Sequence, residues 1–272
     1  MHGIAENGIA DLPPQNVRRG TALVTGGRRG IGRAICLALA RRGFDIAFVD
    51  WVEDCNVDET LSLLATTGRK ARFLPLDISL TNQHEAVIAQ FADELGPINC
   101  LVNNAGIQVS VRGDMLDVDE AEFDRLVGVN LRGTFFMTQA VARRMIAAPA
   151  AGSERSIITI TSANAHLVSP EKAAYCISKA GLSMAMQTFA VRLAEAGVRV
   201  HEIRPGLIET DMTAEVYDRY SPGIRSGDLC ALRRWGEPDD IAMAIAMLAT
   251  GGMPYSTGDI YNIGGGLQIP RL

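Results

Sequence analysis

The sequence has no apolar run of the roughly 18 residues that a membrane-spanning helix requires. Near the N-terminus, Glu6 and Asp11 interrupt the region where a signal peptide would need its apolar segment, and Pro13 and Pro14 follow. We therefore expect residues 1–18 to form a flexible polar tail. The same absences predict a cytoplasmic protein without membrane contact.

The sequence also lacks an excess of positive charge and any pairing of cysteines. Its 26 Lys and Arg residues against 31 Asp and Glu residues give a formal net charge of -5, so nucleic-acid phosphates are not an expected partner. The five cysteines form no Cys-x-x-Cys pair, and His166 and His201 lack the spacing of metal ligands. We expect reduced, mostly structural cysteines and no metal site.

What the sequence does contain is a regular alternation of apolar strand-length runs with longer stretches of helical period. With 272 residues and 47% hydrophobic side chains, the chain can bury one large core. The alternation predicts a single α/β domain over 19–272, a Rossmann-type doubly wound parallel sheet with helices on both faces. The seven expected strands are Ala22–Thr25, Ile46–Asp50, Ala71–Leu76, Cys100–Asn103, Ile157–Thr161, Val198–Ile203 and Ile260–Ile263.

Six helices are expected between these strands. Asp117 and Glu120 have the spacing of a capping box, which predicts where the fourth helix starts. The composition of Pro149–Ser153 predicts a loop. The expected helices are Ile31–Arg42, Val57–Thr67, Gln83–Leu95, Glu120–Met145, Ala173–Ala196 and Asp239–Ala249.

A glycine-rich turn joins the first expected strand to the first helix, with the sequence Thr-Gly-Gly-Arg-Arg-Gly-Ile-Gly over residues 25–32. Glycine allows the tight turn and the close approach of a pyrophosphate, which the N-terminus of the helix would bind. Asp50 ends the second strand about twenty residues later, where a carboxylate can accept hydrogen bonds from ribose hydroxyls. A dinucleotide site is therefore predicted. Asp77, which ends the third strand, could either contact the adenine or form a turn.

A tyrosine and a lysine four residues apart lie on one face of an expected helix: Tyr175 and Lys179. Tyrosine has a reference pKa near 10, so a base at neutral pH needs this pKa lowered by about 3 units. A neighbouring ammonium, helped by an oxidised nicotinamide, can lower it. Ser162, at the end of the fifth strand, would donate a hydrogen bond to the substrate oxygen. Each residue alone has an ordinary structural explanation, but their combination after a dinucleotide loop favours catalysis.

Together these motifs resemble the short-chain dehydrogenase/reductase family over nearly all of residues 21–266. The glycine spacing Gly-x-x-x-Gly-x-Gly is that of the family, and so is a serine followed by Tyr-x-x-x-Lys. The other matching elements are Asn103-Asn104-Ala105-Gly106, the helix asparagine Asn130, and Arg204-Pro205-Gly206 followed by Thr210.

The resemblance implies an NAD(P)-dependent oxidoreductase that moves a hydride between nicotinamide and a carbon bearing an alcohol or ketone. It implies that Asn130 orders a water linking Lys179 to solvent. The implied catalytic residues are Asn130, Ser162, Tyr175 and Lys179. The implied cofactor contacts are Gly26, Arg28, Arg29, Gly30, Ile31, Gly32, Asp50, Trp51, Asp77, Ile78, Asn104, Ala105, Gly106, Tyr175, Lys179, Pro205, Gly206, Ile208 and Thr210. The implied substrate contacts are Ser162, Asn164, His166 and Tyr175.

Within the family, residues 25–32, 175–181 and 256–266 most resemble the β-ketoacyl-acyl-carrier-protein reductase group. A sugar, polyol or steroid-type alcohol dehydrogenase is the alternative, and docking of an acyl carrier protein stays open. A non-catalytic nucleotide-sensing protein is a hypothesis of another class, and the intact catalytic set argues against it. NAD is preferred over NADP, because Asp50 would repel a 2′-phosphate more strongly than Arg29 would attract it.

The region 207–235 resembles the variable substrate lid of the family. Its apolar residues could line a substrate pocket or simply pack a short helix; they are Met212, Val216, Tyr217, Tyr220 and Leu229. The resemblance implies packing of the two long helices Glu120–Met145 and Ala173–Ala196 between subunits. Ala173–Ala196 also carries more small and apolar residues than one face against the sheet requires, which agrees with such packing. With Leu267–Pro270 as a second contact, a homotetramer is expected.

Overall fold

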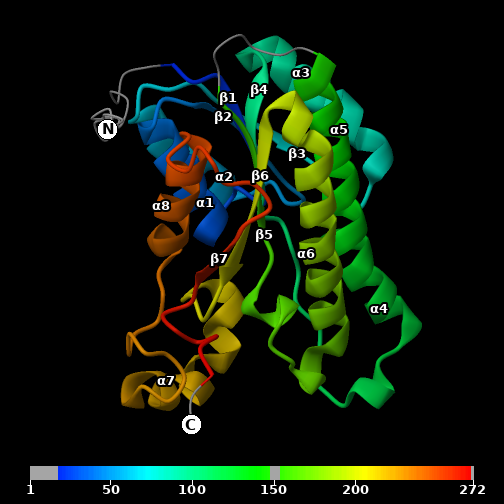
Figure 1. Cartoon of the computed structure of the whole chain (residues 1–272), viewed down its shortest axis with the longest axis vertical. Helices are drawn as coiled ribbons and strands as arrows, with labels where there is room; N and C mark the ends of the chain where they lie inside the picture. Colours follow the sequence, from blue (N-terminus) through cyan, green and yellow to red (C-terminus); the bar gives the residue numbers. More distant parts are fainter. Residues whose placement is uncertain (1–17, 148–153, 271–272) are drawn as a thin grey trace, which may run out of the picture.

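The computed structural model describes residues 18–147 and 154–270, so the predicted tail, except for residue 18, and the predicted loop Pro149–Ser153 lie outside the described residues. Seven parallel strands form one sheet in the order β3-β2-β1-β4-β5-β6-β7 (Figure 1). This order confirms the Rossmann-type prediction. The strands are β1 (Thr21–Thr25), β2 (Asp45–Asp50), β3 (Ala71–Pro75), β4 (Ile98–Asn103), β5 (Arg155–Ile160), β6 (Val198–Pro205) and β7 (Ile260–Ile263).

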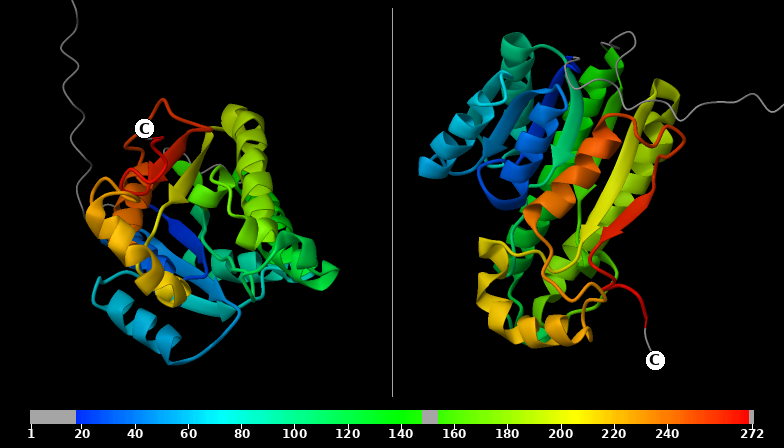
Figure 2. Two further views of the ribbon diagram at one scale, coloured as in Figure 1. Left: turned by 90° about the horizontal axis from the view of Figure 1, so that it is seen from below. Right: turned by 90° about the vertical axis from the view of Figure 1, so that its left-hand side faces the viewer.

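Helices cover both faces of the sheet (Figure 2). One face packs on α1 (Gly30–Arg41), α2 (Cys55–Ala65) and α8 (Pro238–Ala249). The other packs on α3 (His84–Leu95), α5 (Thr134–Ala147) and α6 (Ala173–Leu193).

The core consists of two layers, one on each side of the sheet. Successive residues of β1 alternate between them: Ala22 and Val24 belong to the layer under α1 and α8, and Leu23 to the layer under α5 and α6. Because side chains of a strand point alternately to opposite faces, a strand covered on both faces is apolar throughout. This explains why the buried strands are continuous apolar runs in the sequence.

The fourth expected helix, Glu120–Met145, forms, with a π-helical turn inside it that the sequence did not predict. The helical stretch runs without a gap through α4 (Glu120–Val127), the π-helical turn η3 (Gly128–Gly133) and α5, which begins at Thr134. A Cβ atom at Gly133 would lie 2.5 Å from the carbonyl oxygen of Ile78, so this helix passes very close to the end of the sheet. A π-turn changes the direction of the side chains within it, and here it buries Asn130 completely.

The capping box predicted for Asp117 and Glu120 is wrong. The side chain of Asp119, not Asp117, caps α4 by accepting a hydrogen bond from the backbone N–H of Glu122 at 2.7 Å. Asp117 lies in a preceding 3-10 turn, η2 (Met115–Asp117). Two aspartates at neighbouring positions both fit the pattern, and the sequence cannot separate them. The helix expected over Ala173–Ala196 ends as α6 at Leu193, with a 3-10 turn after it.

Candidate active site

The tyrosine and the lysine singled out in the sequence lie one turn apart on α6, and both side chains are buried. The Nζ atom of Lys179 donates a hydrogen bond to the carbonyl oxygen of Ile160, the last residue of β5, at 3.1 Å. The same Nζ atom lies 5.8 Å from the centre of the Tyr175 ring. The helix therefore places both groups against the carboxyl end of β5, where a ligand of this fold binds.

Ser162 follows β5 and completes this group. Its Oγ atom accepts a hydrogen bond from the backbone N–H of Asn164 at 3.1 Å, which orients the side chain and leaves its hydroxyl proton available to a ligand. Ser162 is also close enough to the phenol to lower the pKa of Tyr175. A carbonyl oxygen between the two hydroxyls would therefore meet two donors.

Asn130 connects the segment after β4 with α6. Its Oδ1 atom accepts a hydrogen bond from the backbone N–H of Ile107 at 2.8 Å, and its Nδ2 atom donates to the carbonyl oxygen of the same residue. The Nδ2 atom also donates to Ser178, whose hydroxyl donates to the carbonyl oxygen of Tyr175. These bonds fix the catalytic helix relative to β4. The ordering of a water by Asn130 stays a prediction.

Burial changes the pKa values of both Tyr175 and Lys179. It raises the pKa of Tyr175 above its ordinary value, and the nearby Ser162 only partly opposes this effect. It lowers the pKa of Lys179 to about 8, against the opposing charge of Glu202. The sequence argument expected a lowered tyrosine pKa, but it could not include burial, which disfavours the phenolate. By itself, the polypeptide keeps the phenol protonated.

The glycine-rich turn has the geometry that close contact with a pyrophosphate requires. Gly26 and Gly30 adopt φ values of 69° and 54°, which favour glycine. A Cβ atom at Gly32 would lie 1.9 Å from the carbonyl oxygen of Gly26, so no other residue fits there. The Nδ2 atom of Asn104 donates to the carbonyl oxygens of Thr25 and Gly26 at 3.1 and 2.9 Å and holds the turn against the end of β4.

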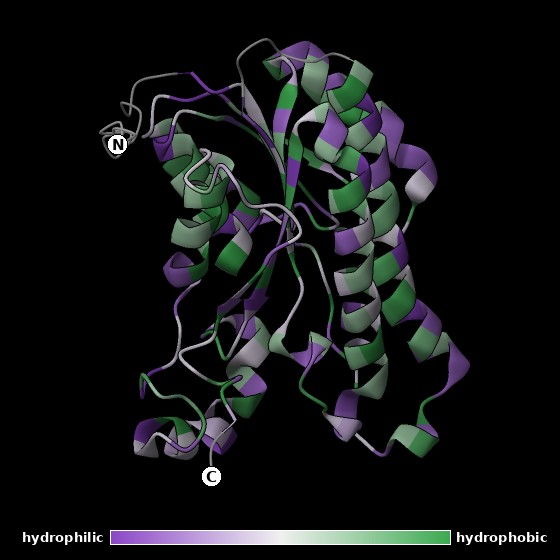
Figure 3. Cartoon of the chain, viewed as in Figure 1, coloured by the Kyte–Doolittle hydropathy of each residue, from purple (hydrophilic) through white to green (hydrophobic). Residues whose placement is uncertain are grey.

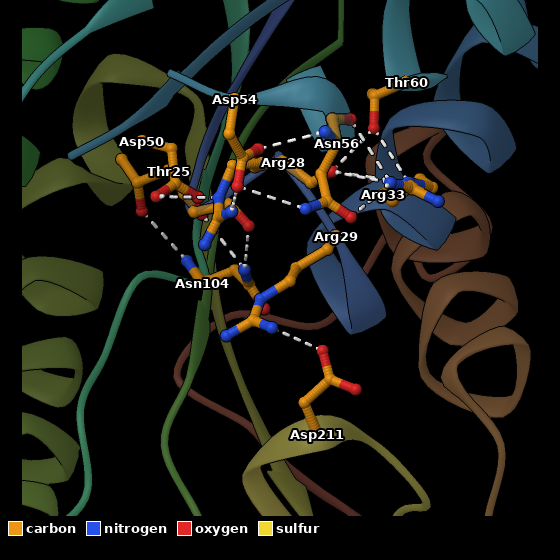
Figure 4. A network of polar contacts seen from close by, with 11 residues as sticks. Thr25, Arg28, Arg29, Arg33, Asp50, Asp54, Asn56, Thr60, Asn104 and Asp211 are labelled. Atoms are coloured by element: carbon orange, nitrogen blue, oxygen red, sulfur yellow. Dashed lines mark hydrogen bonds and ion pairs between the residues drawn. The ribbon is translucent and has the colours of Figure 1, made fainter. Parts of the chain in front are cut away.

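Two arginines of this turn form ion pairs (Figure 4). The buried guanidinium of Arg28 pairs with Asp54, and its Nε atom lies 3.6 Å from a carboxylate oxygen of Asp50. Arg29, which the sequence analysis placed near a 2′-phosphate, instead pairs with Asp211 in the lid. Both positive charges are therefore partnered within the protein.

The remaining predicted cofactor residues differ in their surroundings. Asp77 forms a turn, since its Oδ1 atom accepts the backbone N–H of Ser79 at 2.8 Å; contact with an adenine stays a prediction. Trp51 is 72% exposed beside Asp50. Thr210 caps the 3-10 helix η7 (Asp211–Val216). Ile31, Ala105 and Gly206 are partly buried, while Ile78, Pro205 and Ile208 are buried.

The lid contains η7 and α7 (Tyr217–Ser226), a helix that was not among the six expected. Tyr217 stacks on Trp235 with ring centres 5.1 Å apart, and the indole N–H of Trp235 donates to the hydroxyl of Ser221. Tyr220 and Leu229 pack on the same small cluster. Of the two explanations that the sequence left open, these residues support packing of a short helix. His166 ends the turn after Ser162, and the Nδ2 atom of Asn164 donates to the carbonyl oxygen of Leu167.

The structure adds charged residues that the sequence analysis missed. Glu202 on β6 is buried, and its carboxylate accepts hydrogen bonds from Thr161, Ser183 and Arg204 at 2.6 Å each. A glutamate in a central strand, between Val200 and Ile203, was the available signal, because buried carboxylates are rare unless paired. Lys172 has its Nζ atom 5.4 Å from the centre of the Tyr175 ring.

Comparison with known proteins decides the family. Residues 26–268 match the model of the family described as Enoyl-(Acyl carrier protein) reductase. A 3-oxoacyl-[acyl-carrier-protein] reductase of Staphylococcus epidermidis is 30% identical over 92% of this chain and 99% of its own length. The chain belongs to the short-chain dehydrogenase/reductase family. It is accordingly an oxidoreductase that acts on CH-OH groups.

Other members of the family are similarly close. L-rhamnose 1-dehydrogenase (NAD(P)(+)) of Azotobacter vinelandii is 34% identical over 92% of this chain and 96% of its own. The structure of a 3-oxoacyl-[acyl-carrier protein] reductase from Brucella melitensis in complex with NAD superimposes with a TM-score of 0.90. That protein is 46% identical, and the match covers 94% of this chain and all of that one. Among residues 18–147 and 154–270, no helix is long and apolar enough to cross a membrane.

Proposed function

We propose that this short-chain dehydrogenase/reductase interconverts a ketone and a secondary alcohol, with Tyr175 as the group that donates or accepts the proton. The observation that carries this proposal is the burial of Tyr175 and Lys179 side by side at the carboxyl end of β5. Burial of two polar side chains beside a strand end is costly for stability and is typical of a functional site.

Each residue has a distinct task in this reaction. The nicotinamide, when bound, supplies or accepts the hydride. Ser162 holds the substrate oxygen, and the phenol of Tyr175 donates its proton to that oxygen during reduction. The raised pKa of Tyr175 keeps the proton on the phenol, which suits the reductive direction. Lys179 and Asn130 hold the tyrosine and its helix in place.

The structure also supports the proposal of NAD as the preferred cofactor. Asp50 lies at the end of β2, where the adenosine ribose is expected, and its carboxylate would repel a 2′-phosphate. The nearby guanidinium groups of Arg28 and Arg29 pair with carboxylates, so their attraction for that phosphate is reduced. The relative from Brucella melitensis that was solved with NAD agrees with this preference.

For the substrate we propose two classes of compound. The similarity to 3-oxoacyl-[acyl-carrier-protein] reductases favours a 3-oxoacyl compound, and the similarity to L-rhamnose 1-dehydrogenase favours a sugar. Docking of an acyl carrier protein is not part of the proposal. We retain a nucleotide-sensing protein without turnover as the contrasting hypothesis, against which the four assembled catalytic residues argue.

We also propose a cytoplasmic homotetramer. The solvent-facing sides of α5 and α6 carry large apolar residues, and Met184 and Val191 are 59% and 80% exposed (Figure 3). Phe136 and Ile177 extend this apolar surface. Monomers rarely expose such a surface, and Leu267–Pro270 would add a second contact.

The test is a screen of NADH and NADPH oxidation against acetoacetyl thioesters, keto-sugars and cyclic ketones. We expect at least one class to be reduced, with NADH preferred, and the reaction to be lost in Tyr175→Phe. Turnover that survives in Tyr175→Phe would refute the assigned role of the tyrosine. Cofactor binding without reduction of any of these ketones would favour the nucleotide-sensing hypothesis.

A further inference from the structure

A cavity of about 620 Å³ lies at the turn that leads into α6, the helix that carries Tyr175, in a part of the molecule that the family motifs do not describe. Its volume is within the usual range for small-molecule sites. The lining comes from the segment after β4, from the 3-10 turn η5 (Pro170–Lys172) that leads into α6, and from α7 of the lid. Its lining residues are Arg112, Gly113, Asp114, Met115, Pro170, Glu171 and Arg219.

The cavity is connected to the catalytic centre through η5. Glu171 lines the cavity, and the next residue, Lys172, has its Nζ atom 5.4 Å from the ring centre of Tyr175. Arg112 is close enough to both groups that its charge lowers the pKa of Tyr175 and of Lys172. A substrate whose reacting carbon lies at Tyr175 would therefore extend past Lys172 towards Arg112.

Arg112 has hydrogen-bonding capacity that the protein does not use. Its Nε atom donates to Glu215 of the lid at 3.0 Å, while its Nη1 atom is buried without a partner among the described residues. Burying an unpaired guanidinium N–H is unfavourable. A ligand that accepts hydrogen bonds from this guanidinium would remove that cost.

In the ion pair of Arg112 with Glu215, the cation is better shielded from water than the carboxylate. The side chain of Arg112 is 18% exposed, and that of its partner Glu215 is 64% exposed. Asp114 is exposed, and one of its oxygens accepts the backbone N–H of Leu116. Because charges act more strongly where water is excluded, the guanidinium of Arg112 acts more strongly on its surroundings than the carboxylate of Glu215.

The ion pair of Glu171 with Arg219 adds little net charge to the cavity. Two nitrogens of Arg219 donate to the two carboxylate oxygens of Glu171 at 2.9 and 3.2 Å, so this pair largely neutralises itself. Lys172 is partly buried, and burial together with the charge of Arg112 lowers its pKa. A bound anion would therefore neutralise the positive charges of Arg112 and Lys172.

We propose that this cavity binds the carboxylate of an oxo acid or hydroxy acid substrate, with Arg112 and Lys172 as the residues that bind it. The planar guanidinium suits a carboxylate, which can accept two parallel hydrogen bonds from it. The proposal rests on the function proposed above and narrows its substrate to compounds with an anionic end. It makes the distance between carboxylate and ketone the main determinant of specificity.

The experiment compares 3-oxobutanoate, 4-oxopentanoate and 5-oxohexanoate with their methyl esters in the presence of NADH. For at least one chain length, kcat/KM of the acid should exceed that of its ester by about 10-fold or more, as expected for a charge-assisted hydrogen bond. In Arg112→Gln and in Lys172→Gln this ratio should fall towards one. Arg144→Gln removes one exposed positive charge on α5 and is the matched control, in which the ratio should persist.

A binding measurement separates this proposal from the proposed function. Glutarate should bind the wild-type protein in calorimetry, and its dissociation constant should rise at least about 10-fold in Arg112→Gln but not in Arg144→Gln. Equal use of acids and esters, without glutarate binding, would overturn the carboxylate site and leave the oxidoreductase intact. If no ketone is reduced at all, the proposed function fails, and the calorimetry still decides whether the cavity binds a carboxylate.

Discussion

The two halves of the strand-end edge differ in how far their polar groups satisfy one another. On the cofactor side, Arg33 donates hydrogen bonds to Thr60, Asn56 and the carbonyl oxygen of Arg28, and Arg28 pairs with Asp54 (Figure 4). On the substrate side, Arg112 donates one side-chain hydrogen bond, to Glu215, and its Nη1 atom, like the Nε atom of Arg28, is buried without a hydrogen-bond partner among the described residues.

This difference has a physical explanation. A dinucleotide is bound largely through backbone atoms of a tight turn, so the surrounding side chains can be occupied in bonds with one another. A substrate must be recognised by side chains, and these must keep hydrogen-bonding capacity until it arrives. The small number of hydrogen bonds made by Arg112 therefore fits the proposed substrate side.

Tyr175→Phe should produce the largest change in activity, because it removes the phenol hydroxyl without altering the residues on the cofactor side. We expect kcat to fall by about 1,000-fold or more, since the transferable proton is lost. The dissociation constant of NADH, measured by fluorescence titration, should stay within about 2-fold. Equal loss of NADH binding would show that the two halves are not separable in this way.

Asp50→Ala should change the cofactor side alone. Without this carboxylate, Arg28 gains freedom to meet a 2′-phosphate, and the ratio of kcat/KM for NADP to that for NAD should rise by about 10- to 100-fold. Calorimetry with both cofactors checks the same preference without turnover. A tenfold preference of the wild-type protein for NADP would show that the opposing charges were weighed wrongly.

Lys179→Met measures how much the buried ammonium of Lys179 lowers the free energy of unfolding. The pKa of Lys179 is lowered to about 8 in the folded protein, so the unfolded chain binds more protons between pH 8 and about 10.5. The buried ammonium therefore destabilises the fold fully below pH 8, and less as the pH rises towards 10.5. At pH 7 we expect Lys179→Met to raise the free energy of unfolding by about 1–3 kcal/mol, reduced by the lost bond to Ile160.

Urea unfolding at pH 7 and at pH 10 measures this effect, with Lys70→Met, at an exposed position, as the control. The gain from Lys179→Met should shrink at pH 10, while turnover and cofactor affinity should both be lower than in the wild type. A gain of the same size at both pH values would mean that a buried charge is not its cause.

The smallest effect on catalysis is expected from a change on the outer side of the catalytic helix. Light scattering should give four times the 29.2 kDa mass of one chain. Met184→Asp, on the exposed side of α6, should give a smaller assembly, because it places a charge in the apolar contact. A wild-type mass near 29.2 kDa would refute the interface, and twice that mass would support only one of the two contacts.

The sheet, the glycine turn and the catalytic group were predictable because they depend on local patterns. Buried parallel strands are apolar runs, and Gly32 has no alternative where a Cβ atom would overlap a carbonyl oxygen. The π-helical turn between α4 and α5 was not predictable, since it depends on contact of Gly133 with a residue over fifty positions away. The choice of Asp119 over Asp117 as a cap depends on helix geometry that both positions could satisfy.

The partners of charged side chains were also not predictable from the sequence. The fold brings Asp211 of the lid to Arg29, a partner 182 positions away that the sequence neighbourhood of Arg29 does not show, and contact of Arg29 with the cofactor stays a prediction. Arg112 and Lys172 received no role, because nothing in their sequence neighbourhood shows that they meet beside Tyr175. Charged side chains on loops find their partners only through the tertiary structure.

The central claim, direct hydride transfer between nicotinamide and a carbinol carbon, is tested most directly with NADH that carries deuterium at C4 of the nicotinamide. A ketone that the screen finds to be reduced is incubated with this cofactor, and the product is examined by mass spectrometry and NMR. The account predicts one deuterium on the carbinol carbon of each product molecule, and no such product with Tyr175→Phe. Oxidation of the cofactor without deuterium at that carbon would contradict it.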